Sequence, residues 1–186
     1  MEHSQERWNQ LAVRLKAGDH NAAAELVDAY YTQICLFFRR LGHNRQTSED
    51  MTQETFFQAW QHISQLRSHV LLRSWLYRIA SNVSSLHWRH LRNEKLSGLN
   101  TNTELDAATE TAFSEQAENA EQLGLINQVI TNLPEKLKQA VVLHYMQELT
   151  IEEAADALGI WQGTYKSRLN RALKIIKNEL NKVSKD

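Results

Sequence analysis

The sequence predicts an all-α protein built from two small helical domains, and three features support this. The 186-residue chain contains one proline and six glycines, so few residues interrupt helices. The Asn-Gly and Asp-Gly dipeptides typical of tight β-hairpins are absent. Apolar residues recur at helical spacing in two blocks, which a polar stretch separates. We therefore expect domains over residues 1–95 and 121–186, joined by a flexible acidic linker over residues 96–120.

Four helices are expected in the first domain. The first, second and fourth are expected over Glu6–Lys16, Asn21–Leu41 and Leu71–Arg92. The third is expected to be capped by Thr47 or Ser48 and to end near Ile63. Gly42 can end the second helix, because glycine readily adopts the left-handed conformation found after helices. Residues 45–47 are expected to form a turn and residues 64–70 a loop.

The linker is predicted from its composition. Residues 93–120 are rich in Asn, Thr, Ser, Ala and Glu and contain few large apolar residues, which is typical of a segment that is flexible or only transiently helical. No Lys or Arg occurs between Leu96 and Glu135. Helices are then expected over Glu121–Thr131 and from Pro134 to about Gln147, since proline suits the first turn of a helix.

The strongest motif is a helix-turn-helix over Thr150–Leu173. Thr150 and Glu153 form a T-x-x-E capping box, which starts a helix by satisfying its free N–H groups. Two small alanines follow and allow a second helix to approach closely. Gly159 can supply the left-handed turn, and the second helix is expected to begin near Gln162. In such motifs the second helix enters the DNA major groove.

The residues of this second helix separate onto two faces at about 100° per residue. The inward face holds Tyr165, Leu169, Ala172, Leu173, Ile176 and Leu180, and the outward face holds Lys166, Ser167, Asn170, Arg171, Lys174 and Lys177. Cations can neutralise phosphates, and short polar groups can reach base edges. A charge run alone is usually only a solvated face. The capping box, the small residues, the glycine turn and the two distinct faces together favour DNA recognition.

Residues 71–92 form a second basic helix. Its apolar arc holds Leu72, Trp75, Leu76, Ile79, Val83 and Leu86, and the opposite arc holds Arg78, Ser81, Ser85, Arg89 and Arg92, with Asn82 at the border. Tyr77 and Trp88 are expected on the outer side, beside these cations. Rings beside arginines suit single-stranded nucleic acid, because unpaired bases stack on rings while phosphates bind guanidinium groups. The alternative, that Tyr77 and Trp88 belong to the core, stays open.

The third helix is acidic and rich in amides. Its polar residues are Glu49, Asp50, Gln53, Glu54, Gln58 and Gln61, and its inward residues are Met51, Phe56, Ala59, Trp60 and Ile63. No Lys or Arg occurs between Gln46 and Leu66. Such a face would repel DNA, so it is either a protein-docking surface or a plain solvated helix.

Other classes of protein find little support. Cys35 is the single cysteine, which excludes an internal disulfide, and we expect it to be a small buried hydrophobe. His87 and His90 form the only close histidine pair; a zinc site there is a minor alternative, and we expect no metal and no cofactor. Neither a glycine-rich phosphate loop nor a Ser-His-Asp pattern predicts an enzyme. A secretory signal and a run of ~20 apolar residues are both missing, which favours a cytoplasmic protein without a membrane span.

The ordered motifs resemble those of the extracytoplasmic-function (group 4) sigma factors of the sigma-70 family. LGHNRQTSEDMTQETFFQAW resembles the polymerase-docking region, and RSWLYRIASN resembles the helix that binds the promoter −10 element. LPEKLKQAVVLHYMQELTIEEAADALGI, followed by GTYKSRLNRALKII, resembles the −35-binding domain. The resemblance implies a sigma-2-like helical bundle, a sigma-4-like helix-turn-helix domain and a role as an RNA polymerase sigma factor.

The resemblance also implies site residues and partners. The −35 element would be bound by Thr164, Lys166, Ser167, Arg168, Asn170, Arg171 and Lys174. The −10 element would be bound by Tyr77, Arg78, Asn82, Ser85 and Arg89, and the segment Leu66–Leu72 would capture a flipped base. Polymerase docking would use Asp50, Gln53, Glu54 and Trp60. The implied partners are the RNA polymerase core, through the clamp of its β′ subunit, promoter DNA and an anti-sigma factor.

The chain departs from the family pattern at several positions. Leu66, Arg67 and Ser68 stand where Phe-Arg-Gly is usual, and Leu86 replaces a frequent carboxylate. Trp161, Gln162 and Tyr165 replace a proline and two valines before and within the recognition helix. We expect these changes to affect which promoter is recognised. The alternatives are a stand-alone helix-turn-helix regulator, with a sensor or dimerisation domain in its first half, and a purely adaptor role.

Overall fold

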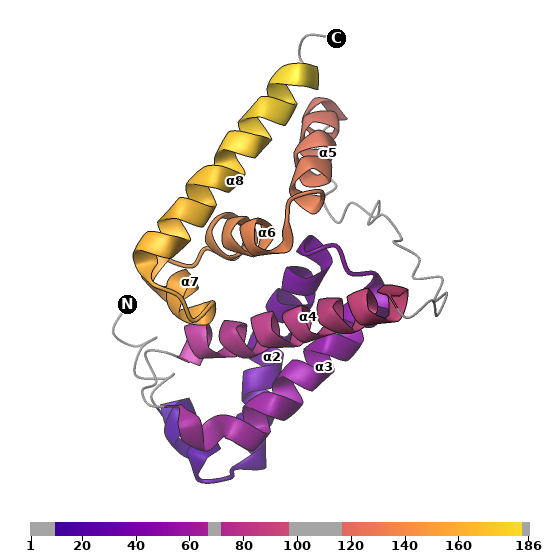
Figure 1. The fold of residues 1–186 in the computed structure, drawn as a ribbon. Helices are drawn as coiled ribbons and strands as arrows, with labels where there is room; N and C mark the ends of the chain where they lie inside the picture. The colour runs from indigo at the N-terminus through magenta and orange to yellow at the C-terminus, as the bar shows by residue number, and fades with distance from the viewer. Residues whose placement is uncertain (1–9, 67–71, 97–116, 184–186) are drawn as a thin grey trace.

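The computed structural model describes residues 10–66, 72–96 and 117–183, and this part of the chain contains helices joined by short turns and no strand, as predicted (Figure 1). The N-terminal block comprises a helix described over residues 10–16, α2 (His20–Arg40), α3 (Arg45–His62), a 3₁₀ turn (Ile63–Gln65) and α4 (Leu72–Leu96). The C-terminal block comprises α5 (Ala117–Thr131), α6 (Glu135–Val141), the π-helical turn η3 (Val142–Met146), α7 (Ile151–Ala157) and α8 (Gln162–Val183). Most of the expected linker lies outside the described residues.

One expected element boundary is wrong, and one expected helix differs in type. Residues 45–47 do not form a separate turn, because α3 already begins at Arg45. The cap is Asn44, whose side-chain oxygen accepts a hydrogen bond from the Thr47 N–H at 2.8 Å. The helix expected to run to about Gln147 does extend to Met146, but its α-helical part ends at Val141 and residues Val142–Met146 form a π-helical turn. Glu148 then adopts a φ of 55°, which turns the chain toward α7.

The core of the N-terminal block lies where α2, α3 and α4 meet. Ile34, Phe37, Phe38 and Leu76 have no measurable exposure, so each contributes about 1.5–3 kcal/mol of hydrophobic stabilisation. At the start of α2, the Asp19 carboxylate accepts a hydrogen bond from the backbone N–H of Asn21 at 2.8 Å, which caps the helix. Cys35 is only half-buried, contrary to the expectation of a fully buried side chain.

The two blocks pack against each other. The first turns of α4 lie beside α7, while α8 runs away from the N-terminal block toward the C-terminus (Figure 1). The C-terminal end of α2 contacts η3. The buried Lys138 side chain of α6 donates a hydrogen bond to the Leu41 carbonyl at 3.1 Å. The buried apolar residues of both blocks form one continuous core.

Candidate nucleic-acid interface

The helix-turn-helix forms as the sequence predicts. The Thr150 backbone N–H donates to the Glu153 carboxylate at 2.8 Å, and the Glu153 N–H donates to the Thr150 hydroxyl at 3.2 Å, which completes the capping box. Gly159 has a φ of 61°, a conformation that most other residues adopt only with strain. These two features set where α7 begins and where α8 can start.

One face of α8 is open to solvent. The exposed residues are Thr164, Lys166, Ser167, Asn170, Arg171 and Lys174, which we call the α8 surface; the predicted Arg168 is half-buried. The opposite face holds Tyr165, Leu169 and Ala172, all buried as expected. The Tyr165 hydroxyl donates to the Ala140 carbonyl of α6 at 2.6 Å, and its burial raises the pKa of this phenol. Leu173, expected to face inward, is 37% exposed, because it lies at the margin of the apolar arc.

The basic helix α4 exposes four of its five predicted −10 residues. Arg78, Asn82, Ser85 and Arg89 are exposed. The outward placement of Tyr77 is wrong, because this side chain is fully buried. It packs edge-on against the Phe37 ring at 5.5 Å between centroids, and burial raises the pKa of its hydroxyl. Tyr77 cannot contact DNA in this arrangement.

Three other expectations for α4 also change. Ser81 is buried rather than exposed, and Leu86 is 46% exposed rather than inward. Trp88 is half-buried and packs against the His43 ring, with 5.1 Å between centroids. The exposed polar face of α4 is therefore narrower than the sequence predicts.

Helix α7 covers the start of α4. The Ser74 hydroxyl donates to the Asp156 carboxylate at 2.9 Å, and the Arg78 guanidinium lies 4.0 Å from the same carboxylate. The buried Tyr77 hydroxyl donates to the Gln147 side-chain oxygen at 2.7 Å. The Asp156 carboxylate thus occupies one side of the guanidinium that would face a DNA phosphate.

A second set of links joins α4 to α6. The Ser84 hydroxyl lies 3.4 Å from the Glu135 carboxylate, and the Gln139 amide lies 3.4 Å from the Ser85 hydroxyl. Burial raises the pKa of Glu135 and lowers that of Lys138. Polar groups of the predicted −10 helix are thus engaged by the C-terminal block at two places.

The predicted docking residues lie on α3. Asp50, Gln53 and Glu54 are exposed. Trp60 is half-buried and stacks on the His20 ring at 5.2 Å, so only part of it faces solvent. Phe57 was not predicted, yet it is 56% exposed on the same helix. In the loop expected to capture a base, Leu66 is buried, and Arg67 and Ser68 lie outside the described residues.

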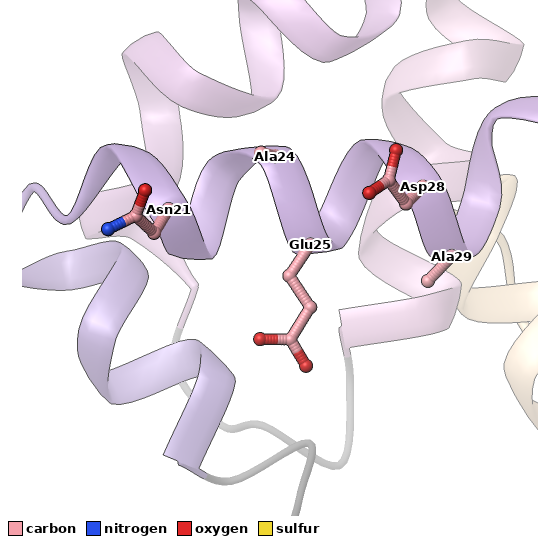
Figure 2. A pocket seen from close by; sticks show the side chains of 5 residues that line it. All are labelled: Asn21, Ala24, Glu25, Asp28 and Ala29. Carbon is pink, nitrogen blue, oxygen red and sulfur yellow. The ribbon is translucent and has the colours of Figure 1, made fainter.

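Other features of the described residues give no sign of a second functional site. An open hollow of about 430 Å³ lies along α2 (Figure 2), where Asn21, Glu25 and Asp28 provide the polar lining and no cation is among the lining residues. The Glu25 carboxylate in this hollow pairs with Arg14 at 3.0 Å.

Across the described residues, no three His, Cys, Asp or Glu side chains converge as a metal site would require. The described helices include none that could cross a membrane.

The role of Asp156 beside α4 is not among the features predicted from the sequence. A signal for it was present, since α7 also carries Glu152 and Glu153 in its first turn and is therefore acidic, whereas α4 is basic. Opposite charge on two helices favours their contact. Helical periodicity alone does not show which helices from different blocks will meet.

Comparison with known proteins supports both blocks. Residues 26–94 match the family Sigma-70 region 2, and residues 123–176 match the family Sigma-70, region 4. The ECF RNA polymerase sigma factor SigW of Bacillus subtilis (strain 168) is 30% identical over 176 residues, covering 90% of this chain and 93% of the relative. The ECF RNA polymerase sigma-E factor of Haemophilus influenzae is 29% identical over 178 residues, covering 91% and 93%.

Solved structures show the same fold. CnrH in complex with the cytosolic domain of CnrY aligns with a TM-score of 0.68 at 20% identity, over 93% of this chain and 96% of that one. RpoE in complex with the anti-sigma factor NepR, from Bartonella quintana, aligns with a TM-score of 0.62 at 21% identity, over 85% and 96%. A stand-alone regulator would not carry the region 2 match. The chain belongs to the extracytoplasmic-function family of RNA polymerase sigma factors, which are not enzymes and direct promoter-specific initiation of transcription.

Proposed function

We propose that the two blocks divide promoter recognition between them. The α8 surface binds the −35 duplex in the major groove, while Arg78, Asn82, Ser85 and Arg89 of α4 bind the separated −10 strand. In this proposal one domain spans residues 1–95 and the other spans residues 121–186. The observation that carries this proposal is the open cationic face of α8, whose opposite face is held to α6 through Tyr165.

For α4 to bind the −10 strand, α7 must move away from it. Asp156 lies beside Ser74 and Arg78, so a DNA phosphate and this carboxylate would compete for the same groups. Extruding a base from the duplex costs a few kcal/mol, which stacking of about 1–3 kcal/mol per base partly offsets. Because the blocks are tethered, binding of one raises the effective concentration of the other at the promoter.

Two protein partners complete the proposal. The docking surface comprises the exposed carboxylates of Asp50 and Glu54, the exposed amide of Gln53 and the half-buried Trp60, and it binds the clamp of the β′ subunit of core polymerase. Both solved complexes contain a second protein, so we infer that an anti-sigma factor also binds this chain. We infer that this chain acts in the cytoplasm, where polymerase and promoter DNA meet.

Run-off transcription on a promoter library tests the promoter assignments. Purified chain with core polymerase should start transcripts from templates that share −35 and −10 elements. Asn82→Ala should impair strand separation, followed with permanganate, more than it impairs binding of the −35 duplex. Equal losses in the two assays would contradict the strand-binding role of α4.

A pull-down of core polymerase tests the docking helix. Glu54→Lys reverses an exposed charge on α3 and should reduce retention of the core. Asp28→Lys makes the same change on an exposed residue of α2 and should retain the core as well as the wild-type chain does. Unchanged retention by Glu54→Lys would remove α3 as the docking surface.

A further inference from the structure

We propose that Trp161 recognises a thymine of the promoter duplex through the thymine 5-methyl group. This extends DNA recognition beyond the α8 surface to the residue that precedes α8. The inference rests on the proposed −35 role of α8.

Trp161 is 86% exposed, more than any other large hydrophobic side chain in the described ranges. Tryptophan is usually buried to a large extent, so an indole this open has no packing role in the free chain. Its backbone is nevertheless well fixed. The Trp161 carbonyl accepts a hydrogen bond from the Tyr165 N–H at 2.9 Å, and Tyr165 is itself anchored to α6.

The residues that follow Trp161 at the start of α8 are also open to solvent. Gln162, Gly163 and Thr164 are all exposed. A Cβ atom added at Gly163 would meet nothing within 4 Å, so the space next to this residue of the first turn is open. In a helix-turn-helix, the N-terminal residues of the second helix contact base edges in the major groove.

The chemistry of the groove selects the target. The thymine 5-methyl is the apolar group that a base pair displays in the major groove, and apolar side chains contact it. A flat indole can cover this methyl group and exclude water from it. The gain should be that of burying one methyl group, which corresponds to about fourfold in affinity.

Replacing thymine by uracil provides the test, because uracil lacks only the methyl group. A promoter duplex selected from the library is prepared with each −35 thymine changed singly to uracil, and binding of the full chain is measured by fluorescence anisotropy. Wild-type chain should lose about fourfold in affinity at one position. Trp161→Ala should bind the unmodified duplex about as weakly as the wild type binds that uracil duplex, and should lose nothing further there.

The control is Tyr145→Ala, which removes another exposed aromatic side chain of the C-terminal block that does not lie on α8. This variant should keep the wild-type response to uracil. Both residues are exposed, so neither change should prevent folding.

The outcomes separate this inference from the proposed function. If the wild type binds and transcribes but no uracil changes its affinity, or if Trp161→Ala keeps the same response to uracil, the thymine contact is wrong and the sigma-factor role stands. An equal loss by Trp161→Ala on every duplex would indicate a contact with the DNA backbone and would also overturn the inference. If the wild type binds no promoter duplex at all, the proposed −35 role fails first.

Discussion

The two basic helices differ in what surrounds them. The exposed cations of α8 face solvent and need no rearrangement to meet a duplex. On α4, Arg78 lies beside the carboxylate of Asp156, and Ser85 lies beside an amide of α6. Similar charge patterns in the sequence therefore lead to one accessible surface and one partly covered surface. We expect the free chain to bind −35 duplex readily and −10 strand poorly.

The links that cover α4 are individually modest. The Arg78–Asp156 pair is about half-exposed on both sides, so screening leaves it at most about 1 kcal/mol. The Tyr77–Gln147 hydrogen bond is buried and contributes about 1 kcal/mol, yet its loss would leave a buried polar group unsatisfied. A contact made of several such links can be stable in the free chain and still open when polymerase and promoter bind.

Substitutions on α8 should weaken DNA binding most. Lys166→Ala combined with Arg171→Ala should weaken −35 duplex binding about a hundredfold, since two charge-assisted contacts of about 1.5 kcal/mol each are lost. The dependence of log affinity on log salt should also fall by about 1.8. Fluorescence anisotropy of the full chain measures both. Lys182→Ala is the matched control, because Lys182 pairs with Glu179 near the end of α8. Unchanged affinity of the double variant would remove α8 as the duplex-binding surface.

The next effect is on the free energy of unfolding and comes from His43, near the contact between α4 and α6. His43 lies 3.2 Å from Ser84, the residue that contacts Glu135 of α6. Burial first, then the charges of His87 and Lys138, lower the pKa of His43 to about 3. Between pH 7 and pH 5 the unfolded chain takes up a proton that the folded His43 does not. The free energy of unfolding should therefore fall by about 2 kcal/mol from this residue.

The comparison variant for this pH effect is His43→Gln. Its unfolding free energy, from urea titrations at both pH values, should fall less than that of the wild type by about the same 2 kcal/mol. The raised pKa of Glu135 acts in the opposite direction at lower pH in both proteins, so it cancels in the difference. Equal losses in the two proteins would show that His43 is not held neutral.

Weakening the contact between α4 and α7 should have a smaller effect, an increase in single-strand binding. Asp156→Asn removes the charge beside Arg78 and weakens the acceptor of Ser74, so single-strand binding by the free chain should improve, by about tenfold at most. Fluorescence energy transfer between labelled blocks should fall in parallel. Glu152→Gln, a change of the same kind at an exposed residue of α7, should alter neither measurement. Improved binding in both variants would assign the effect to net charge alone.

Local features of the fold could be predicted from the sequence, whereas contacts between the blocks could not. Helical periodicity, the Thr150–Glu153 capping box and the Gly159 turn are local signals, and the structure contains all of them. Tyr77 was placed wrongly because its burial depends on Phe37 and Gln147, which are far away in the sequence. The contact between Ser74 and Asp156 is equally non-local. Patterns within one helix show which face is apolar, but not what covers its polar face.

The smallest expected effect separates the two buried tyrosines. Tyr77→Phe removes a hydrogen bond between the blocks, whereas Tyr165→Phe removes one within the C-terminal block. Each should lower the free energy of unfolding by about 1 kcal/mol. Only Tyr77→Phe should increase the separation of the blocks, seen by energy transfer, and it should leave strand binding no weaker than in the wild type. Weaker strand binding by Tyr77→Phe, without greater loss of stability than Tyr165→Phe, would mean that this hydroxyl turns outward and touches DNA after the blocks separate.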